Sequence, residues 1–554
     1  MIPRCTLLVL ALLSASVPGR AQCPPSPALV EAIVENVPAA SEAIGYSVAL
    51  CGDTLALTSM HPGTTAGGPW SVHLFDRDAA GVWGEVAEVT NPDGFGVYFF
   101  GPDLALDGNT LFVGDPTDTS WEGDSAGAAT PFGNGVVHVF ERDHGGPNAW
   151  GESQTLLPPD PTSSFFGVSV AVDGDTLVVG ASSGGPGGAG AAFVYTRLPD
   201  GWRLAHAIPP FAGASLFGAD VAVGPGRIVI GAERSNNDVG LVGVYEQDAS
   251  GAWVQTALLQ PAAATAKLFY GAAVALSGDR IAVGAPCGPV SPPNPGRVRI
   301  YDLDSNGTWN LTKVVKPKVA LSSGAHFGND VALDGDALLV TGPDEPGDPA
   351  WAFFRNEGGT DNWGSILKHT SAGSHEVVAI EGERALIGDP GAVVNGLVAG
   401  AGYLYEDFSP VLPEKYCTPG TSSSGCTATL SSTGCASATD PKGFVVTADG
   451  VEGGKDGLYF FGTQGRQANP WGNGTSFQCV APPVQRCGLL AGSGTPGACD
   501  GVLAQDINAH WKQQPAQNPG AGALVQAQLW YRDPLNTSDQ TTSLSDAIEF
   551  TIVP

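Results

Sequence analysis

Hydrophobic residues alternate with small or polar residues in short runs that recur along most of the chain. The clearest run, FGVSVAVDGDTLVVGA at residues 166–181, contains two alternating stretches joined by a Gly-Asp turn. Such alternation is typical of a half-buried strand, and a Gly-Asp turn between two strands is typical of a hairpin. The pattern therefore predicts a β-hairpin over residues 166–181.

The same phrase returns along the chain and makes seven copies in total. Strong copies begin at Phe100, Phe217, Tyr270 and Phe327, and weaker copies begin near Tyr46 and Glu376. Successive copies are 47 to 66 residues apart, measured between the alanines of their first strands. This period indicates propeller blades with variable loops, because an open β-solenoid needs shorter and more uniform repeats.

Each unit carries two further alternating runs, one before an acidic turn and a tryptophan and one after that tryptophan. Residues 71–83 (SVHLFDRDAAGVW) and 297–309 show the first run, and residues 254–261 show the second. Four short strands in each of seven units amount to about 28 strands. The sequence therefore predicts an all-β chain whose larger part is a seven-bladed β-propeller.

The two ends of the array predict how the ring closes. Residues 28–35 (ALVEAIVE) resemble the strand that follows the tryptophan, but no full unit precedes them, and the last unit ends at residues 402–407 without that strand. We expect residues 28–35 to complete the last blade, which would remove two exposed sheet edges. The propeller is accordingly assigned to residues 22–412.

The repeated phrase resembles the FG-GAP repeat. Phe166-Gly167 and Phe217-Gly218 match its opening, and Val283-Gly284-Ala285-Pro286 matches its close. The resemblance covers approximately residues 26–410. It implies a propeller like those of integrin α-subunits and many bacterial exported proteins, and it implies binding and adhesion more than catalysis.

One feature of that family is missing from the hairpins of this chain. The integrin-type repeat places a calcium loop of the form D-x-D-x-D-G-x-x-D between the two strands, whereas here the connection is as short as Asp173-Gly174-Asp175 or Asp334-Gly335-Asp336. Calcium takes about six to eight oxygen ligands, which so short a turn cannot supply. We interpret these aspartates as turn formers and do not transfer the family's calcium sites.

A different loop has the spacing of a calcium-binding loop. Asp302, Asp304, Asn306 and Asn310 place side-chain oxygens at alternating positions, and Gly307 lies where the chain must bend. The loop lacks a closing bidentate acid, and the equivalent turns at residues 76–81 and 246–251 lack the pattern. These four residues form a weak calcium candidate, with an ordinary turn as the alternative, and no other cofactor is expected.

The repeat disappears after residue 413 and the composition changes. Residues 413–440 are rich in Ser, Thr and Gly with three cysteines, which indicates a linker or a stapled loop region. Alternating runs return at 457–462, 522–533 and 547–554. They predict a smaller, disulfide-stapled, β-sandwich-like domain over residues 441–554. Residues 465–479 resemble part of a C-terminal module of exported bacterial proteins that has no assigned chemistry.

The first 21 residues predict a secretory signal peptide. Arg4 supplies the positive charge, residues 6–17 supply the apolar stretch, and Gly19-Arg20-Ala21 supplies a cleavage site before Gln22. The apolar stretch is too short to span a bilayer, and no later run reaches 18 apolar residues. We therefore expect a secreted protein without a transmembrane segment, extracellular or associated with the cell surface.

Most of the cysteines lie in the last quarter of the chain. The six cysteines there are Cys417, Cys426, Cys435, Cys479, Cys487 and Cys499. In an exported protein such clustering predicts a disulfide framework, whose pairing the sequence leaves open. Cys23, Cys51 and Cys287 lie apart, and the odd total outside the signal peptide implies at least one free thiol.

Charge and composition limit the class of partner. Asp and Glu number 55 against 25 Lys and Arg, a net charge of −30, so the surface repels phosphate backbones and no nucleic-acid partner is expected. The same acidity is compatible with solubility alone or with bound cations. The 77 Gly and 44 Pro residues beside 43% apolar residues indicate many turns between short strands and argue against a disordered chain.

Three candidate catalytic or metal-binding sets lie in unsuitable contexts. Ser182 falls in a G-x-S-x-G match, but a nucleophile elbow needs a strand leading into a helix. His73 and His138 occupy equivalent strand positions, which we interpret as structural or solvent-facing. Asp115 and Asp389 follow second strands and could form a carboxylate pair for glycosidic chemistry, but the sequence does not supply their separation, so we prefer a structural role.

The leading functional hypothesis is an exported, non-catalytic binding or adhesion protein. Its propeller loops, which differ greatly between units (residues 116–135 against 234–240), would contact an extracellular protein or glycan. The first alternative is a propeller hydrolase or lyase acting on extracellular glycans. The second alternative is an architectural protein of the cell envelope.

Overall fold

The structure is a computed structural model. It describes residues 28–34, 43–60, 70–92, 100–118, 134–159, 164–184, 188–261, 267–287, 295–316, 326–342, 349–355, 362–370, 377–408, 413–439, 441–471, 476–533 and 542–552. The expected signal peptide and Cys23 lie outside these residues. The chain divides into two compact units, the first containing Pro27–Arg355 and Trp363–Phe408 and the second containing Ser409–Pro554.

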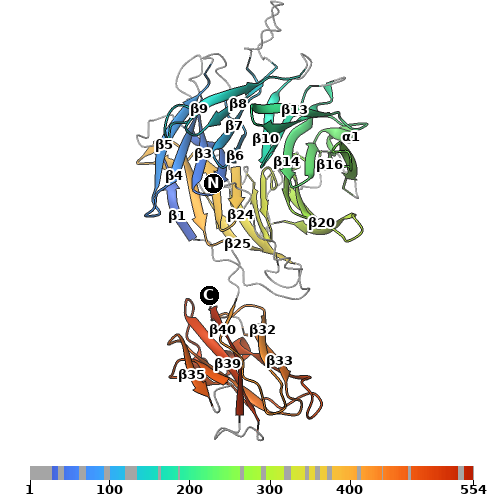
Figure 1. The fold of residues 1–554 in the computed structure, drawn as a ribbon. Helices are drawn as coiled ribbons and strands as arrows, with labels where there is room; N and C mark the ends of the chain where they lie inside the picture. The colour runs from blue at the N-terminus through green and yellow to red at the C-terminus, as the bar shows by residue number, and fades with distance from the viewer. Residues whose placement is uncertain are drawn as a thin grey trace, which may run out of the picture. The chain divides into compact units, whose positions relative to one another are not determined.

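The first unit contains seven four-stranded antiparallel sheets (Figure 1). Blade 1 consists of β2 (Ala43–Cys51), β3 (Thr54–Met60), β4 (Ser71–Arg77) and β5 (Trp83–Thr90). Blade 2 consists of β6 (Leu104–Asp107), β7 (Thr110–Asp115), β8 (Val136–Glu141) and β9 (Gly151–Leu156). Blade 3 consists of β10 (Phe166–Asp173), β11 (Thr176–Ala181), β12 (Ala191–Leu198) and β13 (Gly201–Ile208). Blades 4 and 5 consist of β14 (Phe217–Gly224), β15 (Arg227–Ala232), β16 (Leu241–Gln247) and β17 (Trp253–Leu259); and β18 (Val274–Ser277), β19 (Arg280–Ala285), β20 (Arg297–Leu303) and β21 (Trp309–Val315). Blades 6 and 7 consist of β22 (Val331–Asp334), β23 (Ala337–Thr341), β24 (Ala350–Arg355) and β25 (Trp363–His369); and β26 (Val377–Glu381), β27 (Arg384–Asp389), β30 (Ala401–Glu406) and β1 (Ala28–Ile33).

The predicted seven-bladed propeller is therefore confirmed. The hairpin at residues 166–181 forms as β10 and β11, with Phe166 opposite Ala181 and Asp173 opposite Thr176. The first strand of each blade contacts the first strand of the next blade all the way round, from β2 through β26 and back to β2. These seven inner strands therefore surround the propeller axis. Two short strands, β28 (Val393–Val394) and β29 (Leu397–Val398), form a separate hairpin in blade 7, and a single turn, α1 (Ser235–Asp238), follows β15.

Ring closure depends on the strand nearest the N-terminus. Strand β1 pairs antiparallel with β30, and Ile33, which lies opposite Gly402, is only 3% exposed. Ile33 packs in one cluster with Leu57 of blade 1 and Leu404 of blade 7. The fourth strand of the last blade is thus supplied from the other end of the propeller sequence, so the seam is held by backbone hydrogen bonds as well as by core packing.

The two glycines of the repeated phrase allow neighbouring blades to approach closely. Gly231 of β15 lies against Gly271 of the next blade, where a Cβ added at Gly231 would be 2.1 Å from the Gly271 carbonyl oxygen. Gly271 has a φ of +88°, in the left-handed region that favours glycine. The same approach joins Gly180 to Gly218 at 2.1 Å. The glycines at the opening and close of the phrase are therefore required at the blade interface.

Arginines at the start of the second strands clamp neighbouring blades together. Arg280 donates to Asp302 of its own blade and to Asp336 of the next blade, at 2.6 and 2.8 Å, and its guanidinium lies over Trp363 at 5.4 Å. Arg384 makes the corresponding contacts across the seam, with Asp53 and the ring of Trp83. The turn aspartates expected from the sequence therefore also serve as partners for the preceding blade.

The second unit is a small β-domain with two main sheets. Its strands are β31 (Glu414–Tyr416), β32 (Thr429–Thr433), β33 (Val445–Val451), β34 (Gly457–Gly462), β35 (Arg466–Trp471), β36 (Ser476–Val480), β37 (Gln485–Arg486), β38 (Gly501–Asp506), β39 (Leu524–Arg532) and β40 (Thr542–Thr551). A five-stranded sheet has the order β31-β40-β39-β34-β37, and a three-stranded sheet has the order β32-β33-β38. One helix, α2 (Ile507–Gln513), is capped by Asp506 and is followed by a 3₁₀ turn, η2 (Pro515–Gln517). Within the described residues, no helix has both the length and the hydropathy needed to cross a bilayer.

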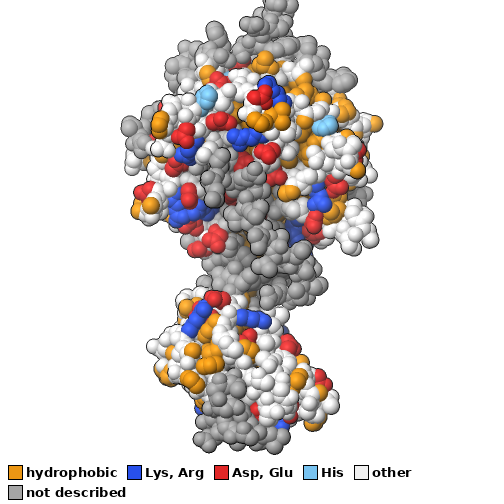
Figure 2. All heavy atoms as spheres, in the orientation of Figure 1, with side chains coloured by type: hydrophobic (Ala, Val, Ile, Leu, Met, Phe, Trp, Pro, Cys, Tyr) orange, Lys and Arg blue, Asp and Glu red, His pale blue; other side chains and the backbone are white. Residues whose placement is uncertain are grey.

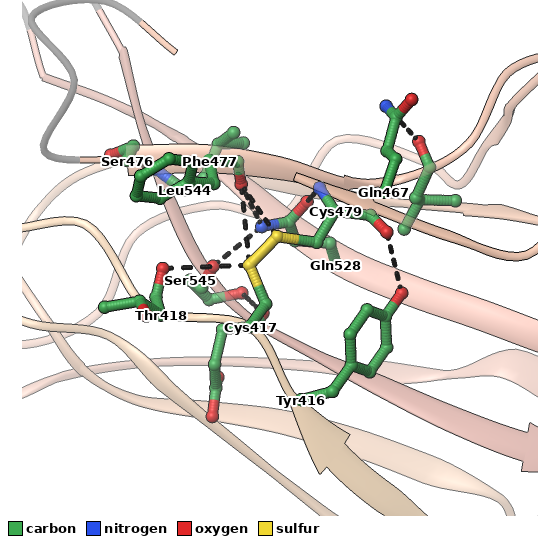
Figure 3. Close-up of a disulfide and its surroundings, with 12 residues drawn as sticks. Tyr416, Cys417, Thr418, Gln467, Ser476, Phe477, Cys479, Gln528, Leu544 and Ser545 are labelled. Carbon is green, nitrogen blue, oxygen red and sulfur yellow. Dashed lines mark hydrogen bonds between the residues drawn. A yellow bond between two sulfur atoms is a disulfide. The ribbon is translucent and has the colours of Figure 1, made fainter. Parts of the chain in front are cut away.

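Two disulfides staple this unit and use four of the six candidate cysteines, whereas the candidate Cys487 is a buried free thiol. Cys417 pairs with Cys479 (Figure 3), and Cys426 pairs with Cys499. In Figure 3, the backbone carbonyl of Cys479 also accepts a hydrogen bond from the Tyr416 hydroxyl at 3.0 Å. In the first unit, Cys51 is disulfide-bonded and Cys287 is a buried free thiol. The expectation of at least one free thiol is therefore met at Cys287.

The expected linker at residues 413–440 needs a correction. Those residues contain β31 and β32, which pair with β40 and β33, and both disulfides begin there. Leu430 and Ala428 are fully buried in the core of the second unit. The sequence of these edge strands is rich in Ser and Thr and lacks a strong hydrophobic alternation. The disulfides and the neighbouring sheet hold the strands in place instead.

Candidate functional site

The calcium candidate loop joins β20 to β21, and its side chains bond to the protein itself. Asp302 binds the Arg280 guanidinium at 2.6 Å. Asp304 accepts backbone N–H bonds from Asn306 and Thr308, both at 2.9 Å, and a bond from the Asn310 side chain at 3.0 Å. These contacts describe an aspartate-capped turn, so Asp302 and Asp304 bind different partners. Calcium at this loop stays a prediction.

The equivalent turns in two other blades have the same construction. Asp78 accepts N–H bonds from Ala80 and Val82, and Asp248 accepts N–H bonds from Ser250 and Ala252. The aspartate of the loop is thus a repeated structural element of the propeller, whatever the residues around it.

The candidate catalytic residues do not meet in one place. Asp115 lies in blade 2 and Asp389 in blade 7, and both are fully buried. Asp389 accepts the Gly391 N–H at 3.0 Å, whereas Asp115 is bonded by Asn91 and lies beside His138. Burial, followed by the charge of Asp118, raises the pKa of Asp115 to about 6. Ser182 is 8% exposed in the turn after β11, as expected for a repeat loop.

Carboxylates gather instead around the propeller axis, at the fourth position of the FG-x-D phrase. Asp103, Ser169, Asp220 and Asp330 occupy this position in blades 2, 3, 4 and 6. Each accepts an N–H bond from the next blade: Val170 N to Asp103 Oδ2 at 2.8 Å, Val221 N to Ser169 Oγ at 3.1 Å, Val274 N to Asp220 Oδ2 at 2.5 Å, and Val378 N to Asp330 Oδ2 at 2.9 Å. These side chains therefore link adjacent blades near the axis.

A second ring of such bonds lies where the inner strands meet their hairpin turns. The last side chain of an inner strand accepts the N–H of a turn glycine in the next blade. The bonds are Gly108 N to Cys51 Sγ at 3.1 Å, Gly335 N to Ser277 Oγ at 2.9 Å, Gly382 N to Asp334 Oδ2 at 2.6 Å, and Gly52 N to Glu381 Oε2 at 2.6 Å. The last of these crosses the seam between blades 7 and 1.

The propeller axis is consequently acidic. The inner strands and the FG-x-D positions contribute Asp103, Asp107, Asp173, Asp220, Asp330, Asp334 and Glu381, and the seven inner strands contain no Lys, Arg or His. Burial, opposed by its backbone hydrogen bonds, raises the pKa of Asp103 to about 7, and the nearby charge of Asp330 contributes to the rise. Burial and the charge of Asp103 also raise the pKa of Asp220. The arrangement favours cations, but its carboxylates already accept N–H bonds from neighbouring blades.

We predict that these acids make propeller stability fall as the pH rises from about 4 to 7. The pKa of Asp103 is near 7 in the folded chain against 3.8 as the ordinary value, so the folded state retains a proton that the unfolded state has lost. Asp103→Asn removes this contribution and one N–H acceptor. The melting temperature of the variant, measured by calorimetry, should increase relative to that of the parent chain as the pH rises. A constant difference across this range, like that expected for the exposed Asp175→Asn, contradicts the prediction.

The sequence contains a signal for these axial acids that single-motif reasoning misses. Asp103, Asp220 and Asp330 all follow the FG dipeptide by two positions, so aligning the seven copies as a column exposes them. The side-chain partners are backbone N–H groups of the next blade, which no sequence motif encodes. Their role therefore becomes visible only once the ring is assembled.

A groove lies between blades 2 and 3. It has two adjoining parts of approximately 490 and 530 Å³ that share Glu141, Arg197, Leu198 and Pro199. The first part is also lined by Asp107, Gly108, Asn109, Thr110, Arg142, Gly174 and Asp175, and the second by His144, Ser153, Gln154 and residues 200–203. We refer to it as the blade 2–3 groove.

The groove carries both signs of charge. Arg197 and Glu141 form an ion pair at 3.2 Å with both side chains more than a third exposed, and Leu198 is 46% exposed beside them. Gln154 is held by two hydrogen bonds to the backbone of Trp202, each 2.8 Å long. Figure 2 shows the same mixture on the visible face of the first unit, where Lys and Arg side chains lie beside Asp and Glu side chains.

The second unit has a smaller, more apolar pocket. It measures approximately 150 Å³ and is lined by Leu458, Phe460, Trp471, Gln478, Val484, Arg486, Trp530 and Leu544. The Trp471 indole N–H donates to the Thr542 hydroxyl at 3.1 Å, which fixes one wall of the pocket. A cavity of roughly this size accommodates a benzene-sized group.

Comparison with known proteins agrees with the repeat and adds little on function. A family model described as FG-GAP repeat matches residues 150–195, from the outer strand of blade 2 into β12 of blade 3. None of the curated proteins matches the chain at a significant level. The periplasmic gluconolactonase PpgL of Pseudomonas aeruginosa is similar in structure, with 16% identity, a TM-score of 0.38, and coverage of 58% of this chain and 85% of that one. A protein from Lactobacillus plantarum gives 16% identity and a TM-score of 0.38, covering 61% of this chain and 92% of that one. At such TM-scores the likeness carries no argument about activity.

Proposed function

We propose that this propeller, which carries the FG-GAP repeat, is the ligand-binding part of an exported protein, and that its ligand is a neutral extracellular glycan bound in the blade 2–3 groove. The observation that carries the proposal is the groove itself, whose two parts measure approximately 490 and 530 Å³. Volumes of this order are typical of small-molecule and oligosaccharide-sized sites. The groove runs between two rigid blades, so a ligand would meet a preformed surface.

The chemistry of the groove suits hydroxyl groups. Glu141 and Asp175 offer acceptors, while Arg197 offers several donors. Leu198 and Pro199 add an apolar surface against which the face of a sugar ring can pack. The net charge of −30 disfavours polyanionic glycans, which is why we propose a neutral one.

The carboxylates of the propeller support binding more than glycoside hydrolysis. Hydrolysis needs two carboxyl groups about 5 to 10 Å apart on either side of the scissile bond. Asp115 and Asp389 are buried in blades separated by blade 1, and Asp103 accepts N–H bonds with both of its oxygens. A carboxylate held in this way links the blades and is poorly placed to transfer a proton.

Export is supported by the two disulfides of the second unit, because disulfides persist in oxidising compartments. Attachment of the protein to the cell surface would place the groove in contact with extracellular polysaccharide. The role of the second unit in that attachment is part of the same proposal.

The proposal is tested by a glycan-array screen followed by titration of the strongest ligand. Arg197→Ala and Glu141→Gln are expected to weaken binding about tenfold or more, since each removes a charge-assisted hydrogen bond. Both side chains are more than a third exposed, so the fold should tolerate these substitutions. Lys368→Ala, an exposed charge on blade 6, is the matched control and should bind like the parent chain.

Three results would overturn the proposal. Release of sugar from the retained glycan would assign the protein to the hydrolase or lyase class instead. Retention of a protein ligand and of no glycan would change the ligand class. Equal binding by the Arg197→Ala variant and the parent chain would move the site away from the groove.

A further inference from the structure

Three ionisable side chains of blade 2 form a buried cluster outside the blade 2–3 groove. Asp115 ends β7, Asp118 lies three residues later, and His138 belongs to the adjacent β8. One carboxylate oxygen from each aspartate and one ring nitrogen of His138 all lie within 4.8 Å of one another. All three side chains are fully buried, with 0% exposure.

One polar atom of this cluster has no partner. The Nδ1 atom of His138 lies 2.8 Å from Glu152 Oε1, so this nitrogen is occupied. The remaining nitrogen, Nε2, is buried without a hydrogen-bond partner, so it is the ring nitrogen available to a ligand shared with the two carboxylates. Buried polar atoms are rarely left unsatisfied, because the loss of hydration is then uncompensated. An unpartnered imidazole nitrogen in a cluster with two carboxylates is therefore available to bind a metal ion.

The charge of the cluster points to the same conclusion. Asp115 has Asp118 and His138 as its charged neighbours, and its remaining contacts are with Asn91 and Thr117. Two buried carboxylates side by side repel each other. A divalent cation at their centre would remove the repulsion and would occupy the free nitrogen.

The donor set and its support match a metal site. A ligating histidine commonly donates its second ring N–H to a carboxylate, which fixes the ring and raises its basicity. Glu152 is in place to accept such a bond from His138 Nδ1. Asn91 Nδ2 lies 2.9 Å from Asp115 and 3.2 Å from Asp118. If its amide is turned, Asn91 would present an oxygen to the same centre. One imidazole with two or three oxygens suits Zn²⁺ or Mn²⁺ better than Ca²⁺.

Blade 1 provides an internal comparison. His73 is paired with Glu85 at 2.7 Å, just as His138 is paired with Glu152. The other ring nitrogen of His73, however, is bonded to the Ser71 hydroxyl at 3.1 Å, and Ser59 stands in β3 where β7 has Asp115. The His–Glu pair is therefore present in both blades. Of the two histidines, only His138 has beside it the carboxylates that could complete a metal site.

We propose that Asp115, Asp118 and His138 bind one divalent transition-metal ion, with Glu152 orienting the imidazole. The ion ties the end of β7 and the following residues to β8, and through Asn91 to the end of blade 1. The structural or solvent-facing interpretation of His138 from sequence is corrected in one respect, since the side chain is buried. The proposal is independent of glycan binding in the groove.

Isothermal titration of the chelator-treated full chain with Zn²⁺, and separately with Mn²⁺, tests the proposal. One molar equivalent of at least one of the two ions is expected to bind at a saturable site. His138→Gln should abolish that binding, and Glu152→Gln should weaken it about 10- to 100-fold. His73→Gln changes the matched pair of blade 1 and should leave metal affinity unchanged.

A second measurement separates metal loss from misfolding. Co²⁺ added to the stripped chain should give the visible absorption of a nitrogen- and oxygen-ligated ion, and Asp118→Asn should change that spectrum while circular dichroism stays that of the parent. The proposal is overturned if neither ion binds the folded parent chain saturably. It is equally overturned if folded His138→Gln binds the ion as tightly as the parent.

Discussion

A Gly231→Ala variant is expected to lose about 2 kcal/mol or more of unfolding free energy in the propeller. The new Cβ would lie 2.1 Å from the carbonyl oxygen of Gly271 in the next blade. That contact is with backbone, so no flexible side chain can move aside, and blades 4 and 5 must separate. The separation would disturb Ile230 and Val229, both fully buried beside the glycine. The propeller transition in differential scanning calorimetry measures the effect.

Gly84→Ala is the matched control for this substitution. Gly84 also lies in a propeller strand, but a Cβ added there meets no atom within 4 Å. Its melting temperature should lie close to that of the parent chain, because surface substitutions without such contacts usually change stability by less than about 0.5 kcal/mol. Equal effects of the two alanines would show that the blades do not depend on the close approach of Gly231 and Gly271.

The propeller could be predicted from the sequence because one phrase specifies one unit of structure. Alternation over residues 166–181 defines β10 and β11, and the turn between them is read directly from Asp173-Gly174-Asp175. Seven copies multiply this local signal, so no long-range inference is needed to obtain the blades. The second unit carries a weaker signal, so the Ser- and Thr-rich residues 413–440 predict a linker although β31 and β32 form there.

The chemistry of the chain was harder to predict because it depends on contacts between blades. Asp103 and Asp220 accept N–H bonds from residues more than fifty positions away in sequence. The sequence presents Asp115 and His138 as separate candidates, and their proximity depends on the antiparallel register of β7 and β8, where Asp115 lies opposite Val136. A residue type is visible in the sequence by itself, whereas a site depends on the strand register that brings its residues together.

The axial acids and the arginine clamps explain how so acidic a ring holds together. Acids near the axis accept backbone N–H bonds, and acids at the hairpin turns bind arginines such as Arg280 and Arg384 of the preceding blade. The acids in these two roles therefore have partners within the protein. The buried pair Asp115 and Asp118 is different, because the charged groups that act on Asp115 are Asp118 and His138.

Removing β1 is expected to cause the other large loss of stability. A chain that begins at Ala43 lacks the strand that pairs with β30, so the backbone of Ala401–Glu406 becomes an exposed sheet edge. It also lacks Ile33, which is 3% exposed in the cluster that joins blades 7 and 1. Burial of one such side chain contributes about 2 to 4 kcal/mol, and the lost backbone pairs add to it. We expect a much lower propeller melting temperature and a tendency to aggregate through the open edge.

A synthetic peptide of residues 28–34 provides the control for this deletion. The peptide should pair with β30 in trans and restore part of the melting temperature, and a peptide with Ile33→Asp should not, because a charge would enter the seam. A peptide with Val30→Asp should still restore stability, since Val30 is 46% exposed. If the shortened chain melted like the full chain, closure by β1 would be unnecessary, and the arginine clamp of Arg384 on Asp53 would have to hold the seam without it.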